Sequence, residues 1–396
     1  MDGLHSHLIS VPVVRGVRQR IRALGTAFLF AVLVCGAYAA EKEIVVAQVA
    51  PFSGPVSFYA RETQLGAAAY FAAVNARGGV RGAKIRFVTR DDGLDPTKTV
   101  ALFREVAGGE APVAFMFPVG PASIEAIVRL KLPQDLGIPV LGWIPPMYKL
   151  RSPVNPFVFH IGQGDDAEVA KLVEHIATLG MKELGVVFWN DPAIRDVVQI
   201  VEQEAARRRL TIKILLPTET AGKADLKEVA KTLMTINPPA VVVMLPVGET
   251  AQLVANLREA KSRMWVYGPS YNESGTLYEA AGQENAVGVS VSQLVPNPFN
   301  RSIRLVGDYQ DHMRAYAPAG TRWSSLSLEG YVAAKVLVEA IDRAGPTPTA
   351  ARVRDQLEGL RHFDLGGLTI SYGPGQHVGL RFLDIGVVTR GGKLLY

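Results

Sequence analysis

The sequence predicts an α/β protein with two doubly wound parallel-sheet lobes joined by a three-segment hinge. Three observations lead to this prediction. Strand and helix patterns alternate in two consecutive series after Ala40, the last hundred residues break that alternation, and the composition is that of a globular protein. Hydrophobic residues make up 48% of the 396 residues and charged residues 20%. A chain of this length forms one large or two medium domains.

The first series begins with Glu43–Ala50, a short apolar run rich in β-branched residues, which is typical of a buried parallel strand. Arg61–Asn75 then places leucine and alanine at helical spacing, and Gly78–Gly79 ends that helix. Lys84–Thr89 predicts the next strand. Asp95–Pro96 starts a helix well, because aspartate accepts from free N–H groups and proline suits the first turn. The alternation continues through Pro112–Phe117 (strand), Ser123–Leu132 (helix) and Ile138–Leu141 (strand).

A second series repeats the alternation. Its first helix, Asp165–Leu179, has an acidic first turn that complements the helix dipole. Two consecutive series of this kind predict two parallel sheets, each covered by helices on both faces. The expected strands are Phe157–Ile161, Leu184–Trp189, Thr211–Leu216, Ala240–Leu245, Met264–Tyr267 and Val287–Val291. The other expected helices are Ile194–Arg208, Leu226–Thr235 and Thr250–Ala260.

The last hundred residues cannot form a third series, because helices come first and strands follow. We expect the helices to return to the first lobe and the final strands to join the second, so that the chain crosses between lobes and forms a hinge. The expected N-terminal lobe is residues 40–160 and 294–365, and the C-terminal lobe is residues 161–293 and 366–396. The expected elements are helices Arg304–Tyr316, Ser325–Ala344 and Thr349–Leu357, then strands Leu368–Tyr372 and Arg381–Val388.

Residues 1–39 have the pattern of a cleaved signal peptide. Four arginines precede the apolar run Ala27–Val34, and Ala37–Ala39 supplies the small residues of a cleavage site. The run is about half the length of a membrane span; a short membrane anchor or buried helix is the alternative. Cys35, the only cysteine, is an alternative lipid anchor, although valine precedes it where a small residue is expected. Cleavage predicts a periplasmic protein without cysteine and without stable membrane insertion.

The net charge is +5, but most of this excess lies in residues 1–39, so the remainder of the chain is not basic enough to indicate a nucleic-acid partner. Residues 1–39 carry four arginines against one aspartate, a local +3, which leaves about +2 for the remainder. No later cluster of basic residues alternates with aromatic ones as a nucleic-acid groove requires.

Three motifs follow one another early in the chain: S-G-P at 53–55, N-A-R-G-G-V-R-G-A-K-I at 75–85 and D-D-G-L-D-P at 91–96. In this order and spacing they resemble the type I periplasmic binding proteins of the leucine/isoleucine/valine-binding kind. Weaker similarity continues through L-G-I-P-V at 136–140, Y-G-P at 267–269 and S-L-E-G-Y-V-A-A at 327–334, and so covers nearly all of the mature chain. The resemblance implies the substrate-binding component of an ABC importer, with a permease as partner and a small ligand held between two closing lobes.

Candidate ligand-binding residues follow the carboxyl ends of the expected strands, where ligands collect in open parallel sheets. Five of the eleven are aromatic, and binding pockets are typically apolar with a few placed polar groups. The expected ligand-binding residues are Phe52, Ser53, Tyr59, Gly120, Ala122, Ser123 and Trp143 in the first lobe, and Trp189, Asp191, Tyr271 and Glu273 in the second.

Two of the loops that contain these residues would contact the charged groups of a ligand. Val119–Ser123 can hold a carboxylate through helix N–H groups and the Ser123 hydroxyl; an ordinary helix cap is the alternative. Amino-acid-binding members of the resembled family present an acidic residue after a G-P pair, but Ser270 stands there here. A buried ammonium needs a carboxylate, so Glu273 or Asp191 would have to replace it. An aromatic or apolar carboxylate is therefore favoured, with an amino acid as the alternative.

The sequence lacks the motifs of the common enzyme classes. It contains no H-E-x-x-H, G-x-S-x-G, P-loop or complete G-x-G-x-x-G pattern. We therefore expect no catalytic residues, no metal and no cofactor, and a monomer. Two other functions remain open: a ligand-sensing component of a signalling system, and an enzyme on a similar two-lobed scaffold.

Overall fold

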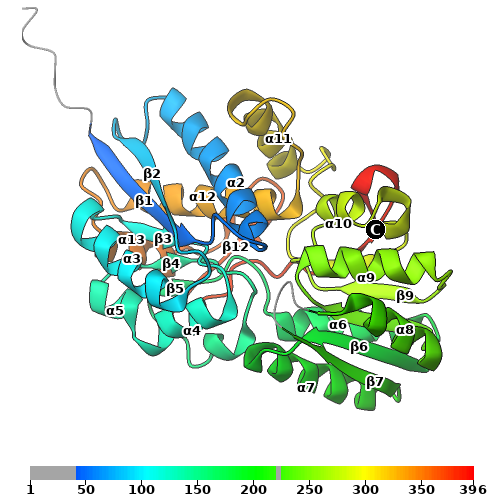
Figure 1. Ribbon diagram of the computed structural model, residues 1–396. Helices are drawn as coiled ribbons and strands as arrows, with labels where there is room; N and C mark the ends of the chain where they lie inside the picture. Colours follow the sequence, from blue (N-terminus) through cyan, green and yellow to red (C-terminus); the bar gives the residue numbers. More distant parts are fainter. Residues whose placement is uncertain (1–41, 220–223) are drawn as a thin grey trace, which may run out of the picture. The chain divides into compact units, whose positions relative to one another are not determined.

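Two large sheets organise the computed structural model, which describes residues 42–219 and 224–396 (Figure 1). The expected signal peptide, residues 1–39, lies outside the described residues. The first sheet is wholly parallel, in the order β2-β1-β3-β4-β5. Its strands are β1 (Glu43–Ala50), β2 (Lys84–Asp91), β3 (Ala114–Met116), β4 (Val140–Leu141) and β5 (Val158–Phe159).

The second sheet has the order β14-β13-β10-β9-β8-β6-β7. Strands β6 to β10 run parallel, whereas β13 and β14 pair antiparallel at one edge. An antiparallel edge on an otherwise parallel sheet is common in doubly wound folds. The strands are β6 (Glu183–Trp189), β7 (Thr211–Thr218), β8 (Ala240–Met244), β9 (Trp265–Gly268), β10 (Ser290–Gln293), β13 (Asp384–Val388) and β14 (Leu394–Leu395).

Helices cover both faces of each sheet because strand residues alternate between two apolar cores. In β1, Val46 packs in one core with residues of α2, while Ala47 packs in another with α3 and α4. In β8, Val241 and Val242 divide in the same way between the α8–α9 side and the α6–α7 side. These helices are α2 (Ser57–Ala76), α3 (Pro96–Glu110), α4 (Pro121–Arg129), α5 (Leu132–Leu136), α6 (Asp165–Thr178), α7 (Pro192–Arg207), α8 (Leu226–Ile236) and α9 (Val247–Glu259).

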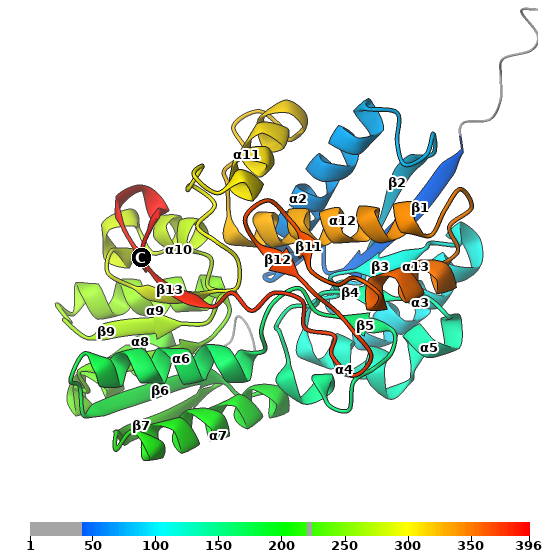
Figure 2. The same cartoon turned by 180° about the vertical axis from the view of Figure 1, so that it is seen from behind.

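The late helices return to the first sheet, as the sequence predicts (Figure 2). Helix α12 crosses α2 at backbone contact: a Cβ on Gly66 would lie 1.7 Å from the Ser327 carbonyl oxygen. A Cβ on Gly330 would lie 2.1 Å from the Thr63 oxygen, so glycine on both helices permits this approach. The late helices are α11 (Arg304–Tyr316), α12 (Ser325–Arg343) and α13 (Ala350–Glu358).

The chain passes between the two sheets three times: after β5, after β10 and before β13. Two of these passages are hydrogen-bonded to each other. His160 N donates to the His377 oxygen at 2.8 Å, and Leu380 N donates to the Ile161 oxygen at 2.7 Å. The three passages together form the hinge that the sequence predicts.

The structure differs from the sequence-based expectation in three places. The strand expected at Phe157–Ile161 as the first of the second series is β5, which pairs with β4 in the first sheet. Leu368–Tyr372 does not join the second sheet; β12 (Thr369–Ile370) pairs with β11 (Phe363–Asp364) in a separate hairpin. Gly366 and Gly367 both have positive φ, which lets the chain turn back on itself within a few residues. A short helix, α10 (Ser274–Ala280), also stands where no helix was expected. The boundaries of the two lobes in sequence remain a prediction.

Candidate functional site

One cavity lies where the carboxyl ends of strands from both sheets meet. Its volume is about 460 Å³, including its open mouth. We call it the cleft pocket. The first-sheet side contributes Val56, Tyr59, Leu94, Val119, Gly120, Pro121, Ile144 and Pro145. The second-sheet side contributes Trp189, Ile194, Met244, Leu245, Pro246 and Tyr271.

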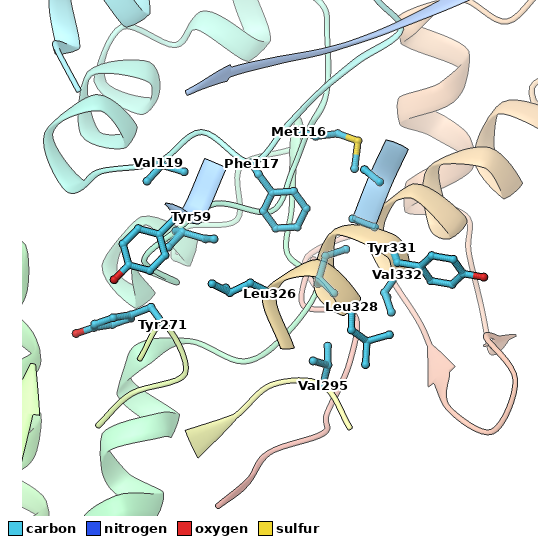
Figure 3. Packing of buried hydrophobic residues seen from close by; sticks show 14 of the residues in the cluster. Tyr59, Met116, Phe117, Val119, Tyr271, Val295, Leu326, Leu328, Tyr331 and Val332 are labelled. Atoms are coloured by element: carbon cyan, nitrogen blue, oxygen red, sulfur yellow. The ribbon is translucent and has the colours of Figure 1, made fainter. Parts of the chain in front are cut away.

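The lining of the cleft pocket is apolar apart from two phenols and an indole. The Tyr59 hydroxyl accepts a hydrogen bond from Val247 N at 2.9 Å, which joins α2 to the start of α9. Burial raises the pKa of both Tyr59 and Tyr271, so both phenols are neutral. Figure 3 shows the two rings next to each other. The buried Trp189 Nε1–H has no partner among the described residues, so it remains free to donate to a ligand.

Gly120 lets a side chain from another loop reach the cleft pocket. Its φ is 100°, a conformation that favours glycine, and a Cβ there would lie 2.5 Å from Leu94 Cδ1. Leu94 itself has a φ of 65° in the turn after β2. An alanine at position 120 would therefore strain the backbone and collide with Leu94.

Four of the residues expected from the sequence line the cleft pocket together: Tyr59, Gly120, Trp189 and Tyr271. Strand alternation locates them, since each follows the carboxyl end of a strand. The sequence analysis missed Leu94, Ile194 and the Met244–Leu245 pair as lining residues. Leu94 belongs to the D-D-G-L-D-P motif, and this was the one signal that could have located it.

Four other expected residues lie on the same loops but do not line the cavity. Phe52 is half-buried, and its N–H donates to Asp91 Oδ1 at 2.9 Å. Ser53 and Ala122 are exposed. Ser123 is buried, and its hydroxyl lies 2.9 Å from Thr99 Oγ1. The hydroxyl that was expected to hold a carboxylate therefore contacts Thr99 and does not line the cleft pocket.

The two acidic residues expected to pair with an ammonium group act as helix caps. Glu273 is 2% exposed and accepts from Gly275 N at 3.0 Å and Thr276 N at 2.7 Å at the start of α10. Asp191 accepts from Ala193 N at 2.9 Å at the start of α7. Neither lines the cleft pocket. An acidic residue shortly after a strand is often such a cap, because the next helix begins there.

A buried carboxylate that the sequence analysis missed lies behind Tyr271. Glu168 of α6 is wholly buried and accepts from Ser270 N at 2.7 Å and from the Ser292 hydroxyl. Burial raises the pKa of Glu168. Glu168 does not line the cleft pocket. Its hydrogen bond with Ser270 N holds the loop after β9 against α6.

Trp143, the remaining expected residue, lines a second and smaller cavity. The indole is 3% exposed and packs edge-on against His160, with ring centroids 4.6 Å apart. Ile144 and Pro145 line the cleft pocket, whereas Trp143 and Pro146 line this cavity. Residues 142–146 therefore form a wall that the two spaces share.

Comparison with known proteins gives consistent results. A family model described as periplasmic binding protein matches residues 43–393. The Leu/Ile/Val-binding protein homolog 3 of Brucella melitensis is 22% identical over 351 residues, which are 87% of this chain and 90% of the relative. No helix among the described residues is both long enough and apolar enough to cross a bilayer.

Solved structures agree with this match. A substrate-binding periplasmic protein from Ralstonia solanacearum superimposes with a TM-score of 0.84 at 29% identity, covering 89% of this chain and 99% of that one. A branched-chain amino acid ABC transporter protein from Thermus thermophilus, solved with bound valine, gives a TM-score of 0.81 at 21% identity, covering 90% and 95%. These likenesses confirm the predicted fold class.

Proposed function

The chain belongs to the periplasmic binding protein family, and we propose that it captures a small carboxylic acid with an apolar or aromatic body for an ABC importer. Members of the family bind small molecules and work with ABC transporter components. In the proposed role this protein acts in the periplasm as a single chain and without catalysis. Its two lobes close on the ligand, and the permease recognises the closed state.

The observation that carries the proposal is the apolar lining of the cleft pocket. Aromatic and aliphatic side chains come from both sheets, so a ligand body held there touches both lobes at once. Burial of apolar ligand surface between the lobes favours closure by about 25 cal/mol per Å². A polar solute such as a sugar would leave its hydroxyls without partners in this pocket.

The caps formed by Glu273 and Asp191 favour a ligand without an ammonium group. Both carboxylates already accept backbone N–H groups, and neither lines the cleft pocket. An ammonium buried among the lining residues would lack a counter-charge, which is unfavourable. The relatives named for Leu, Ile and Val keep a branched-chain amino acid as the rival ligand.

A thermal-shift screen followed by titration calorimetry tests the proposal. The probes are benzoate, phenylacetate, 3-phenylpropanoate and 4-methylpentanoate, their amides, succinate, L-leucine and L-phenylalanine. The proposal expects the apolar acids to raise the melting temperature more than the amides or the amino acids do. Stabilisation by L-leucine alone would assign the rival ligand, and turnover of any bound acid would contradict a binding role.

A further inference from the structure

The second cavity lies beside the hinge and is bounded by chemically active groups. Its volume is about 190 Å³, including space open to solvent, and its walls include two of the three hinge passages, at Ile161 and Leu294. We call it the hinge chamber and define it by its polar side chains: Trp143, Arg151, His160, Gln163 and Glu329. The role proposed for the cleft pocket uses none of these five groups.

Three buried nitrogen atoms of the hinge chamber have no hydrogen-bond partner among the described residues. They are Trp143 Nε1, Arg151 Nε and His160 Nδ1. Trp143 and His160 are 3% and 4% exposed, so bulk water does not solvate them. Indole and guanidinium nitrogens can only donate, so what satisfies them must be an acceptor. Buried polar groups are rarely left unpaired, which indicates that an occupant belongs in the chamber.

Arg151 gives this occupant a charge preference. Its guanidinium donates to the Gly162 oxygen at 2.8 Å and takes part in no ion pair within residues 42–219 and 224–396. Burial lowers the pKa of Arg151, yet a guanidinium remains protonated in proteins. No described carboxylate lies within ion-pair distance of this buried cation, so an incoming anion that contacts it directly is favoured.

The two titratable side chains that line the chamber with Arg151, Glu329 and His160, do not oppose an anion at neutral pH. Burial, aided by the nearby Glu168, raises the pKa of Glu329 to about 8, so this side chain is mainly a neutral acid that can donate. Burial also lowers the pKa of His160 well below its ordinary value, so the imidazole is neutral. The other carboxyls near Arg151 are Asp165, Asp166 and Glu168. Burial raises the pKa of Asp165 to about 7, and Asp165 and Glu168 already accept backbone N–H groups of Tyr148 and Ser270.

We propose that the hinge chamber is the carboxylate subsite of the ligand, with Arg151 and Trp143 donating to the carboxylate oxygens. The inference rests on the proposed function, since it places the acid group of a ligand whose body fills the cleft pocket. The two spaces are neighbours, because residues of the 142–146 loop line both of them. The start of α4 offers fewer donors, because Pro121 has no N–H and Ser123 does not line the cleft pocket.

Formate tests the chamber separately from the cleft pocket, because it has a carboxylate and no apolar body. We expect formate to raise the melting temperature of the wild-type protein above that in sodium chloride of equal ionic strength. Arg151→Gln should abolish the effect. Trp143→Phe replaces the indole with a smaller aromatic ring and removes the N–H, so it should weaken formate binding even if the arginine variant folds poorly. Loss of charge-assisted hydrogen bonds predicts about 10- to 100-fold weaker binding.

A second probe separates failure of this inference from failure of the proposed function. The acid 3-phenylpropanoate should bind the wild-type protein, lose about 10- to 100-fold in affinity in Arg151→Gln, and lose affinity in the cleft-pocket control Trp189→Ala. Formate binding should survive Trp189→Ala. If formate does not bind, or binds Arg151→Gln equally well, the chamber holds only water and the inference is wrong. If formate binds but none of the apolar acids does, the chamber stands and the proposed function fails.

Discussion

The hydrogen bond between Tyr59 and Val247 should set how readily the two lobes close. Tyr59 lies in α2 beside the first sheet, and Val247 is the first residue of α9 beside the second. The 2.9 Å bond between the hydroxyl and the backbone N–H exists only while these helices face each other. Tyr59→Phe removes the hydroxyl and keeps the ring, which is 5% exposed. The variant therefore loses a contact of the closed state alone.

The size of the effect follows from the energy of one hydrogen bond. A neutral hydrogen bond contributes about 0.5–1.5 kcal/mol net. In Tyr59→Phe the Val247 N–H loses its acceptor and faces a phenyl ring, so the loss of stability of the closed state lies toward the upper end of this range. If the ligand binds only the closed state, the whole loss appears in the closing equilibrium. The dissociation constant of a bound acid should rise about 2- to 13-fold. The melting temperature of the ligand-free protein should change little.

Calorimetry with the tightest acid, together with X-ray scattering of the free and bound protein, measures both quantities. Tyr70→Phe is the matched control, because Tyr70 lies on the same helix but packs on Tyr331, with ring centroids 5.0 Å apart, within the first lobe. The control should leave the dissociation constant unchanged. An unchanged constant in Tyr59→Phe, or an equal rise in Tyr70→Phe, would refute the role of this bond in closure.

Two further predictions concern stability. Gly330→Ala should destabilise the fold by about 1–3 kcal/mol in urea denaturation, because its Cβ would lie 2.1 Å from the Thr63 oxygen. The control is Gly108→Ala on α3, where no atom lies near the added Cβ; this change should stabilise the fold by about 0.5–1 kcal/mol. An equal effect of both changes would contradict the close packing of α12 on α2. Glu329→Gln should flatten the pH dependence of the free energy of unfolding. The pKa of Glu329 is about 8 in the folded protein and 4.5 ordinarily. The protonated side chain therefore adds stability at low pH, and this stability is lost as the pH rises from about 4.5 to 8. Parallel wild-type and variant curves over this range would contradict a neutral Glu329.

Periodicity was enough to predict the two-lobed architecture. Strands such as β1 and β8 are buried on both faces and read as continuous apolar runs, and the helices between them have caps that the sequence displays. Asp95, for example, accepts from Thr97 N at 2.8 Å as its position before a proline predicts. These signals are local, so they need no knowledge of the tertiary structure.

The elements that the sequence did not predict depend on short segments. Helix α10 has only seven residues and includes Gly275, so it shows too little periodicity to stand out. The hairpin of β11 and β12 depends on the turn at Gly366–Gly367, whereas the apolar residues of Leu368–Tyr372 alone suggest a sheet strand. Turn chemistry decided the pairing there, and hydrophobicity did not.

The candidate site was predictable only in part. Tyr59, Gly120, Trp189 and Tyr271 follow strand ends, and the topology of parallel sheets brings such positions together. Arg151 was not predictable, because it lies in a long connection without a periodic pattern. Its burial beside His160 and Glu329 arises from chain segments far apart in sequence. Side chains that serve as caps, such as Glu273, cannot be told from ligand-binding acids by sequence position alone.

A crystal structure of the protein with the tightest acid from the screen tests the central claim most directly. The claim is that a small apolar carboxylic acid is held between the strand ends of the two sheets. The account predicts the ligand body in contact with Tyr59, Ile144, Trp189 and Tyr271, and its carboxylate within hydrogen-bond distance of Trp143 Nε1 and the Arg151 guanidinium. A ligand bound elsewhere, or an ammonium group of an amino acid paired with Glu168 or Glu273 in the same cleft, would contradict it.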